Sequence, residues 1–366
     1  MADPRARKTA LIPKALAVVV LTLASAGSIE WSAYQPPFNA ASLAGVAAAS
    51  ATDVWAVGLK SGGECQYATL AVHWNGSMWS PVAAPSVQRV NSVLADVDAL
   101  SADDAWAVGH TACPGRQDGR TLVEHWDGSA WQRVSSPNSG SFAVLSAVAA
   151  LAPGDVWAVG STVVGVDGVA LTEHWNGTRW RIVPAPALTG NDDLEDVAGS
   201  SSKDVWAVGA AVGADGNDRP LVEHWDGAAW QLVTVSTPGG APGYLAGVAA
   251  ISPTNAWAVG GYRPGGGALQ PLLLHWNGVR WRLVSVPSLG DFAALTAIAR
   301  SGSGLFAAGF TVPPDASHAV VLERSNDPWQ EVDAPPDLDL SDLAATRSGE
   351  LFAVSGPAVW RGVPGP

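Results

Sequence analysis

The sequence predicts an all-β protein, a seven-bladed β-propeller built from four-stranded antiparallel blades. Seven internal repeats carry this prediction. The hexapeptide motif DVWAVG occurs at 53–58, 155–160 and 204–209, with DAWAVG at 104–109 and NAWAVG at 255–260. Two weaker copies, GLFAAG at 304–309 and ELFAV at 350–354, continue the series. Four-stranded units repeated at a period near fifty are typical of propellers, in which sheets are arranged around an axis.

Each repeat contains four short strand-like pieces, here called a, b, c and d. In the second repeat they read LADVDALS (94–101), DAWAVG (104–109), TLVEHWDG (121–128) and AWQRVSSP (130–137). All are rich in Val, Trp and Leu and are bounded by turn residues, and none has room for an amphipathic helix. Piece a is mostly Ala and Gly, which suits a crowded central axis. Strand b is predicted to end at the glycine of the hexapeptide motif, which leads into a loop.

The joint between c and d is the best-specified turn. It reads Asn-Gly or Asp-Gly in five repeats, at 75–76, 127–128, 176–177, 226–227 and 277–278. These pairs tolerate the positive φ angles of a type I′ hairpin, so c and d are predicted to be antiparallel neighbours joined by a tight turn.

With its Gly after strand b and Trp farther on in strand d, the layout resembles secreted bacterial kelch and galactose-oxidase-like propeller repeat proteins. The resemblance covers about residues 28–366 and differs from kelch in ending strand b with one glycine, except at Gly260-Gly261. The last repeat has a c-like PAVWRG but no d, and SIEWSAYQPP at 28–37 matches a d strand. We therefore expect the N-terminal strand to complete the seventh blade, and residues 27–366 to form a single propeller.

The first 26 residues have the features of a secretory signal peptide. Basic residues in MADPRARKTALIPK precede an apolar run from Ala15 to Ala26, which ends in the small residues Ala24-Ser25-Ala26. This pattern predicts cleavage and a secreted protein with no stable membrane span after processing. An uncleaved anchor is the alternative. The net charge of −13 and the lack of basic runs argue against nucleic-acid binding. We expect a monomer.

The conspicuous tryptophans and histidines occupy repeat positions. The 18 tryptophans are interpreted as filling the wedges between blades, against the alternative of a sugar-stacking lectin. Because each regular repeat has Asp at the start of b and His in c, we predict structural hydrogen-bonded pairs: Asp53–His73, Asp104–His125, Asp155–His174 and Asp204–His224. The fifth repeat has Asn255 with His275. In the sixth, Gly304 and Arg324 replace the pair, and the seventh has Glu350 and Val359. Glu124, Glu173 and Glu223 also repeat, so we do not assign them as a catalytic pair.

We expect the functional residues to be among those that differ between the repeats. The variable b–c and d–a loops are therefore the candidate binding face. Candidate ligand-binding residues there are Tyr67, Arg89, His110, Arg116, Arg120, Tyr244, Tyr262 and Arg263. Cys65 and Cys113 lie in loops of adjacent blades and are predicted to form a disulfide, which export permits. Asp192, Asp193, Asp215 and Asp218 could hold Ca²⁺, with solvated acidic loops as the alternative. No other cofactor is expected.

These features favour a secreted, non-catalytic binding module whose loop face binds an extracellular protein or a polysaccharide; no catalytic residue is assigned. One alternative is an extracellular propeller enzyme, either copper-oxidase-like or a carbohydrate hydrolase or lyase. The resemblance raises the copper chemistry, for which Cys65, Tyr67 and the off-repeat His110 and His318 are the available residues, without matching a family motif. A structural spacer of the cell envelope is the third hypothesis.

Overall fold

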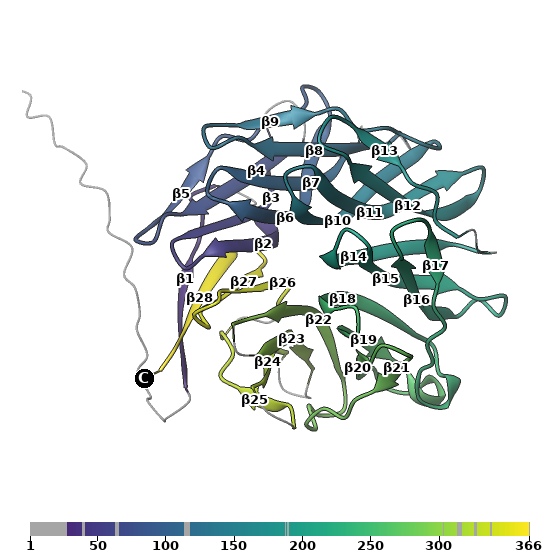
Figure 1. Cartoon of the computed structure of the whole chain (residues 1–366). Coiled ribbons are helices and arrows are strands. Elements are labelled where there is room, and N and C mark those ends of the chain that lie inside the picture. Colours follow the sequence, from purple (N-terminus) through teal and green to yellow (C-terminus); the bar gives the residue numbers. More distant parts are fainter. Residues whose placement is uncertain are drawn as a thin grey trace, which may run out of the picture.

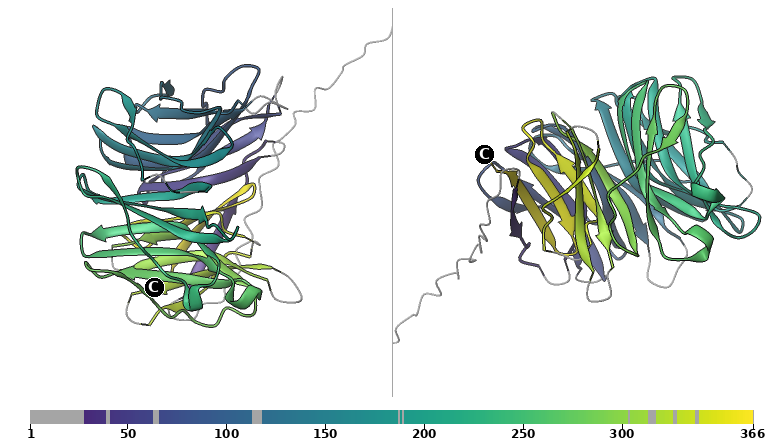
Figure 2. Two further views of the ribbon diagram at one scale, coloured as in Figure 1. Left: turned by 90° about the vertical axis from the view of Figure 1, so that its right-hand side faces the viewer. Right: turned by 90° about the horizontal axis from the view of Figure 1, so that it is seen from below.

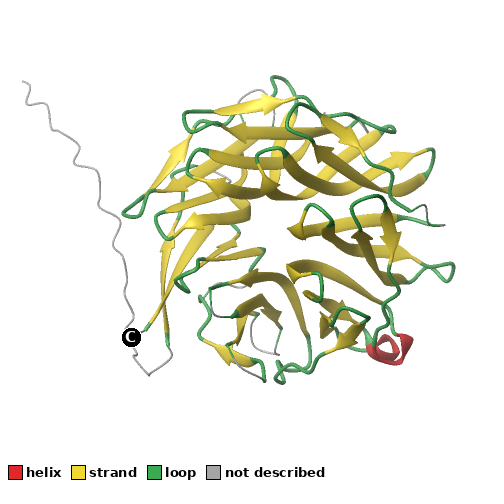
Figure 3. Cartoon of the chain, in the orientation of Figure 1, coloured by secondary structure: helices red, strands yellow, loops and turns green. Residues whose placement is uncertain are grey.

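Seven four-stranded antiparallel sheets surround a central axis in the computed structural model (Figure 1). The structure describes residues 28–38, 41–62, 66–112, 118–186, 188, 190–302, 304–312, 317–325, 328–336 and 339–365. Almost all regular structure is strand, and the described helical segments are two short 3-10 turns, η1 (Pro238–Gly240) and η2 (Pro264–Gly266) (Figure 3). The predicted fold class, blade number and blade composition are confirmed.

The strands of the first three blades follow the chain from the axis outward. Blade one contains β2 (Ser42–Ser50), β3 (Asp53–Ser61), β4 (Tyr67–Trp74) and β5 (Trp79–Val82). Blade two contains β6 (Asn91–Ser101), β7 (Asp104–Ala112), β8 (Arg120–Trp126) and β9 (Trp131–Val134). Blade three contains β10 (Phe142–Ala152), β11 (Asp155–Val164), β12 (Asp167–Trp175) and β13 (Trp180–Ile182).

The next three blades repeat this order. Blade four contains β14 (Asp192–Ser201), β15 (Asp204–Val212), β16 (Asp218–Trp225) and β17 (Trp230–Leu232). Blade five contains β18 (Gly243–Ser252), β19 (Asn255–Tyr262), β20 (Gln270–Trp276) and β21 (Trp281–Leu283). Blade six contains β22 (Ala293–Arg300), β23 (Leu305–Thr311), β24 (His318–Arg324) and β25 (Gln330–Val332).

Blade seven joins the two ends of the chain. It contains β26 (Asp342–Ala345), β27 (Leu351–Ser355) and β28 (Ala358–Pro364), and its outer strand is β1 (Ile29–Tyr34). β1 pairs antiparallel with β28 along its whole length, from Ile29 opposite Pro364 to Tyr34 opposite Val359. Figures 1 and 2 show this first strand, in purple, beside the last strand, in yellow. The expected completion of the seventh blade is confirmed, and it covers an edge that would otherwise be open.

Strand b does not end at the glycine of the hexapeptide motif, so that expectation is wrong. β3 continues past Gly58 to Ser61, and the equivalent strands also run beyond their glycines. The glycine lies opposite a bulge in the inner strand, between Leu43 and Gly45. A Cβ at residue 58 would lie 2.0 Å from the carbonyl oxygen of Ser42. Only glycine allows the two backbones to approach this closely.

The c–d connection is also different from the predicted two-residue hairpin. β4 ends at Trp74 and β5 begins at Trp79, so four residues join them. Gly76 has φ +88°, but Arg89 is the one non-glycine residue with positive φ in the described chain, so Asn75 lacks the φ of a type I′ turn. Instead, Asn75 Oδ1 accepts hydrogen bonds from the backbone N–H groups of Ser77 and Met78, both at 3.0 Å. The side chain therefore caps the turn, as Asx residues commonly do.

Aromatic wedges fill the spaces between blades, as the repeat positions predicted. The strand-b Trp55 is fully buried, and its ring centroid lies 4.4 Å from that of His73 in its own blade. The same ring meets Trp126 and Trp131 of blade two at 4.8 and 5.0 Å. Trp106, Trp157 and Trp206 repeat this arrangement in the next three blades. Aromatic contacts thus link each of blades one to five to the blade that follows it, and link blade seven to blade one.

The Asp–His hydrogen bonds occur in each regular blade. The Nε2···Oδ1 distances are 2.5 Å for Asp53–His73, 2.8 Å for Asp104–His125, and 2.7 Å for both Asp155–His174 and Asp204–His224. In blade five the Asn255–His275 distance is 3.0 Å. These pairs join the start of strand b to the end of strand c, and each imidazole also packs on a buried indole.

Strand register corrects the sequence alignment of strand c by one residue in blade six and by two residues in blade seven. Phe352 pairs with Arg361, so Arg361, and not Val359, takes the histidine position, and it bonds Glu350 at 2.9 Å. In blade six Phe306 pairs with Glu323, so Arg324 takes the tryptophan position of strand c. Its guanidinium lies 4.7 Å from the Trp257 ring centroid. A polar pair in blade seven and a cation–π contact in blade six therefore replace the regular side chains.

Candidate functional site

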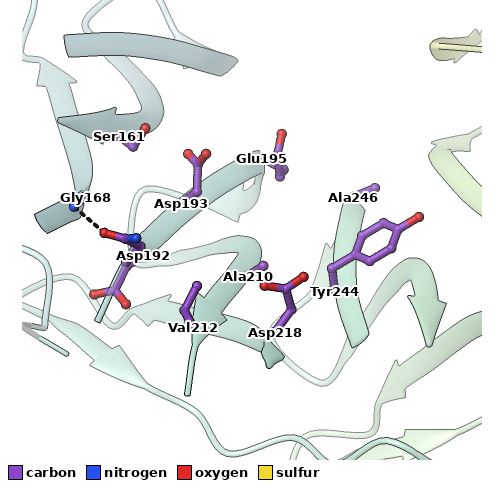
Figure 4. A pocket seen from close by; sticks show the side chains of 11 residues that line it. Ser161, Gly168, Asp192, Asp193, Glu195, Ala210, Val212, Asp218, Tyr244 and Ala246 are labelled. Atoms are coloured by element: carbon purple, nitrogen blue, oxygen red, sulfur yellow. Dashed lines mark hydrogen bonds between the residues drawn. The ribbon is translucent and has the colours of Figure 1, made fainter. Parts of the chain in front are cut away.

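Strand direction places the variable loops on one face. Because neighbouring strands in each blade are antiparallel, the b–c and d–a connections lie at one end of the sheets and the a–b and c–d turns at the other. A cavity of about 560 Å³ opens on the loop face between blades three, four and five. We call it the acidic cleft, because its lining includes Asp192, Asp193, Glu195 and Asp218 (Figure 4).

The inner strand of blade four supplies most of the polar lining. β14 begins at Asp192, and a bulge between Leu194 and Asp196 follows Asp193. The preceding Asn191 Oδ1 accepts the backbone N–H of Gly168 at 2.6 Å, which joins blade four to blade three (Figure 4). Asp218 begins β16, and Tyr244 lies in β18 of blade five. The cleft is therefore held by paired strands rather than by free loops.

Every formally charged residue that lines the acidic cleft is a carboxylate. Burial raises the pKa of Asp193, and the hydroxyl of Ser161 partly offsets this by a hydrogen bond. Burial also raises the pKa of Glu195, and the nearby carboxylate of Asp193 raises it further. Both side chains are nevertheless exposed to solvent, so water screens part of the repulsion between them.

Asp192 is the most buried carboxyl group of the lining. Its exposed fraction is 2%, and its Oδ1 has no hydrogen-bond partner in the structure. Burial raises the pKa of this carboxyl group, while the backbone N–H of Leu188 acts in the opposite direction. An unpaired buried polar atom costs roughly 1–3 kcal/mol, and Asp192 carries this cost on the core face of β14, on the opposite side of the strand from Asp193 and Glu195.

Tyr244 forms the blade-five side of the acidic cleft. Burial raises the pKa of its hydroxyl; the Arg263 guanidinium lowers it, and the carboxylate of Glu195 raises it. Arg263 itself lies with its guanidinium carbon 5.7 Å from the ring centroid of Phe292. Of the seven ligand-binding candidates within the described residues, Tyr244 is the one that lines the cleft.

The remaining candidates lie elsewhere on the structure. Tyr262 and Arg263 follow one another at the end of β19 and just after it, also in blade five. Tyr67 begins β4 and Arg120 begins β8, both partly or largely exposed, while His110 lies within β7 against Phe142 at a centroid distance of 6.4 Å. Arg89 precedes β6 with φ 64°. Arg116, Cys65 and Cys113 lie outside the described residues, so the disulfide stays a prediction.

The four calcium candidates do not all meet. Asp192, Asp193 and Asp218 line the acidic cleft, but Asp215 is exposed and bonds Arg219 at 2.6 Å. In the described part of the chain, no group of three or more His, Cys, Asp or Glu side chains is arranged to hold a metal ion.

A second acidic feature, absent from the sequence interpretation, lies on the axis. Asp96, Asp98, Asp196 and Asp342 project from inner strands and line the central channel. Asp196 Oδ2 accepts the backbone N–H of Val248 in the next blade at 2.7 Å, and Asp96 and Asp342 make the equivalent bonds. Burial, with smaller contributions from neighbouring carboxylates, raises the pKa of Asp196 to about 8 and that of Asp342 to about 6.

The acidic cleft adjoins a second cavity at the axis, and Glu195 and Ala246 line both. One sequence signal could have revealed the axial acids. Asp96 interrupts the Ala and Gly of piece a at the position that Gly45 and Gly247 occupy in other repeats.

Three further carboxyl groups are buried in the aromatic wedges. Glu124, Glu173 and Glu223 are fully buried, and both oxygens of each have no hydrogen-bond partner. Burial raises the pKa of each to about 8. They lie in separate blades, which agrees with the decision not to assign them as a catalytic pair.

Comparison with known proteins gives structural neighbours. No protein-family model and no curated protein matches the sequence. The structure is similar to YCF48 bound to D1 peptide, at 16% identity, a TM-score of 0.58 and coverage of 95% of this chain and 99% of that chain. It is also similar to a streptogramin B lyase structure, at 10% identity, a TM-score of 0.60 and coverage of 92% and 98%.

A third neighbour is the WD40 β-propeller domain of Doa1, at 10% identity, a TM-score of 0.58 and coverage of 90% and 97%. These likenesses agree on the β-propeller and do not support the narrower kelch or galactose-oxidase assignment. In the described part of the chain, no helix has the length and apolar character needed to cross a membrane.

Proposed function

We propose that this chain is a secreted, non-catalytic binding module that holds a segment of a partner protein on its loop face. The observation that carries the proposal is the acidic cleft, which opens among the connections that differ between repeats. A concave site with a few convergent polar groups is the usual form of a binding site. The rigid blades position it, and the loops around it can vary without disturbing the core.

The structural neighbours are compatible with this proposal. One of them is YCF48 in a complex with a peptide. Another is an enzyme, a streptogramin B lyase, and the shared fold does not choose between the two roles. We prefer binding because the lining of the cleft combines exposed carboxylates with apolar side chains, and no nucleophile or acid–base pair is assigned there. Export of residues 27–366 after cleavage at Ala26 is part of the proposal, and N-terminal sequencing of the protein from the growth medium tests it.

Tryptophan substitutions on the two opposite faces of the propeller test the binding function. Random peptides displayed on phage are selected on the full mature chain, and enriched peptides are then measured against two variants. Val212→Trp places an indole in the acidic cleft, whereas Ala228→Trp adds the same group to the exposed c–d turn on the opposite face. The proposal predicts peptides that lose affinity for Val212→Trp and keep it for Ala228→Trp. Failure to enrich any peptide, or enrichment only of peptides blocked by Ala228→Trp, would contradict it.

A further inference from the structure

We propose that the propeller docks on an anionic lipid surface through one edge, where the face formed by the a–b and c–d turns meets the outer strands of blades three to five. We call this edge the basic rim, after its five exposed basic side chains: Arg179, Arg181, Lys203, Arg280 and Arg282. The basic rim lies at the opposite end of the blades from the acidic cleft. Docking there would leave the loop face and its cleft open to a partner.

The strands place these basic residues together at one edge. The outer strands β13, β17 and β21 follow one another along one side of the ring (Figure 1). The c–d turns that lead into β13 and β21 contain Arg179 and Arg280, and an arginine is the second residue of each of these strands. Lys203 lies between them in blade four, because a Cβ at Gly227, in the c–d turn of that blade, would lie 2.8 Å from its side chain.

The cations of the basic rim are not neutralised by the protein itself. In the described part of the chain, none of the five side chains makes a hydrogen bond, ion pair or cation–π contact. One carboxylate, Asp226, lies in the same turns, and it accepts the backbone N–H groups of Ala228 and Ala229. The net charge of the whole chain is −13, but at physiological ionic strength charges beyond about 8 Å are largely screened. The local excess of cations therefore decides how this edge interacts with a charged surface.

Exposed aliphatic side chains on the same three blades are an independent observation. Two residues after the outer-strand Trp lie Ile182, Leu232 and Leu283, with exposed fractions of 39, 48 and 53%. Strand register places Pro81, Arg133, Glu331 and Ala33 at this position in blades one, two, six and seven. Among the seven blades, a large aliphatic side chain thus occupies this position only in the three blades of the basic rim.

Charge and exposed apolar surface together favour a lipid bilayer over a soluble polyanion. Val279, beside Arg280 in the c–d turn of blade five, is 81% exposed. Basic side chains are attracted to anionic headgroups, and apolar side chains beside them are stabilised when they enter the boundary with the acyl chains. A soluble polyanion would contact the charges and leave the aliphatic side chains in water.

Vesicle co-sedimentation with the full mature chain tests the inference. Vesicles of phosphatidylcholine containing one-third phosphatidylglycerol are compared with vesicles of phosphatidylcholine alone, at about 0.15 M salt. Arg280→Gln and Arg282→Gln each remove one charge of the basic rim, and Leu283→Ser removes an aliphatic side chain. The matched controls lie on the loop face: Arg120→Gln changes an exposed arginine, and Val166→Ser changes a side chain that is 93% exposed. Circular dichroism verifies that each variant is folded.

We expect wild type to bind the anionic vesicles at least about tenfold more tightly than the neutral ones. Each arginine substitution in the basic rim should weaken this binding about fivefold, which is the contribution of one basic residue near an anionic surface. Leu283→Ser should weaken it about threefold, and both controls should change it less than about twofold. Equal binding to the two kinds of vesicle would overturn the inference, and so would equal losses for Arg280→Gln and Arg120→Gln.

Soluble poly-glutamate distinguishes a membrane from an acidic macromolecule. If poly-glutamate binds as tightly as the anionic vesicles and Leu283→Ser leaves vesicle binding unchanged, the basic rim recognises a polyanion and the lipid inference fails. The outcome is separable from that of the acidic cleft. Val212→Trp should leave vesicle binding unchanged, and Arg280→Gln should leave peptide binding at the cleft unchanged, so either proposal can fail alone.

Discussion

Replacing Glu173 by glutamine should change how the stability of the protein depends on pH. The side chain is fully buried, both carboxyl oxygens lack hydrogen-bond partners, and burial raises its pKa to about 8. In the unfolded chain a glutamate has a pKa of about 4.3. Between these values the unfolded state loses the proton and the folded state keeps it, so unfolding becomes easier as pH rises.

The magnitude follows from this difference. One pKa unit corresponds to about 1.4 kcal/mol, so the Glu173 carboxyl should lower the free energy of unfolding by about 1.4 kcal/mol per pH unit from roughly pH 5 to pH 8. Glutamine has nearly the same shape and does not titrate. The free energy of unfolding of Glu173→Gln minus that of wild type should therefore rise by up to about 1.4 kcal/mol per pH unit from pH 5 to pH 8. Above pH 8 this difference should stay constant.

Urea unfolding followed by circular dichroism at unit intervals from pH 5 to pH 9 measures the difference. Glu331→Gln, which removes an exposed carboxylate in β25, is the control and should show little pH-dependent difference. Register places Val72 and Leu274 at the positions equivalent to Glu173 in blades one and five, so an apolar side chain is compatible with this site. A stability difference that stays constant from pH 5 to pH 8 would refute the reasoning, because it would mean that the native carboxyl group is already ionised.

Three other predictions concern the scaffold. Trp131→Ala should destabilise the protein by about 3–5 kcal/mol, because the indole is 5% exposed and packs edge-on against Trp55; in urea unfolding, a loss no larger than that of Leu283→Ala, an exposed control, would contradict this. Gly209→Ala should prevent or strongly weaken folding, because its Cβ would lie 2.0 Å from the Asp193 carbonyl oxygen; a native melting temperature would be the contrary result. Removing residues 28–36 should expose the edge of β28 and produce oligomers in light scattering; a stable monomer would show that β1 is dispensable.

The sequence was sufficient to predict the architecture because the same residue types recur at equivalent positions of the repeats. Repeated Trp, His and Asp positions indicated the wedges and the Asp–His bonds without knowledge of the distances. Strand c was misaligned by one residue in blade six and by two residues in blade seven, because the side chains of these blades had changed identity together. Only strand register shows that Arg361 replaces histidine and that Arg324 replaces tryptophan.

The acidic cleft was predictable only in part. Asp192, Asp193, Asp218 and Tyr244 stood out as unshared polar residues, but the sequence did not show that three blades bring them together. The axial aspartates were missed because their role depends on an inter-blade bond to a neighbouring backbone N–H, as from Val248 to Asp196. Local patterns contain no information about such contacts, since the partner lies about one repeat away.

Photo-cross-linking offers the most direct test of the claim that the loop-face cleft is the binding site. A peptide enriched by the phage selection, carrying a benzophenone in its sequence, is irradiated with the mature protein and the adducts are located by mass spectrometry. The account predicts adducts within 190–195, 210–218 and 243–247, which supply the cleft-lining residues of blades four and five. Adducts confined to the c–d turns of the opposite face, or spread around the outer strands, would contradict it.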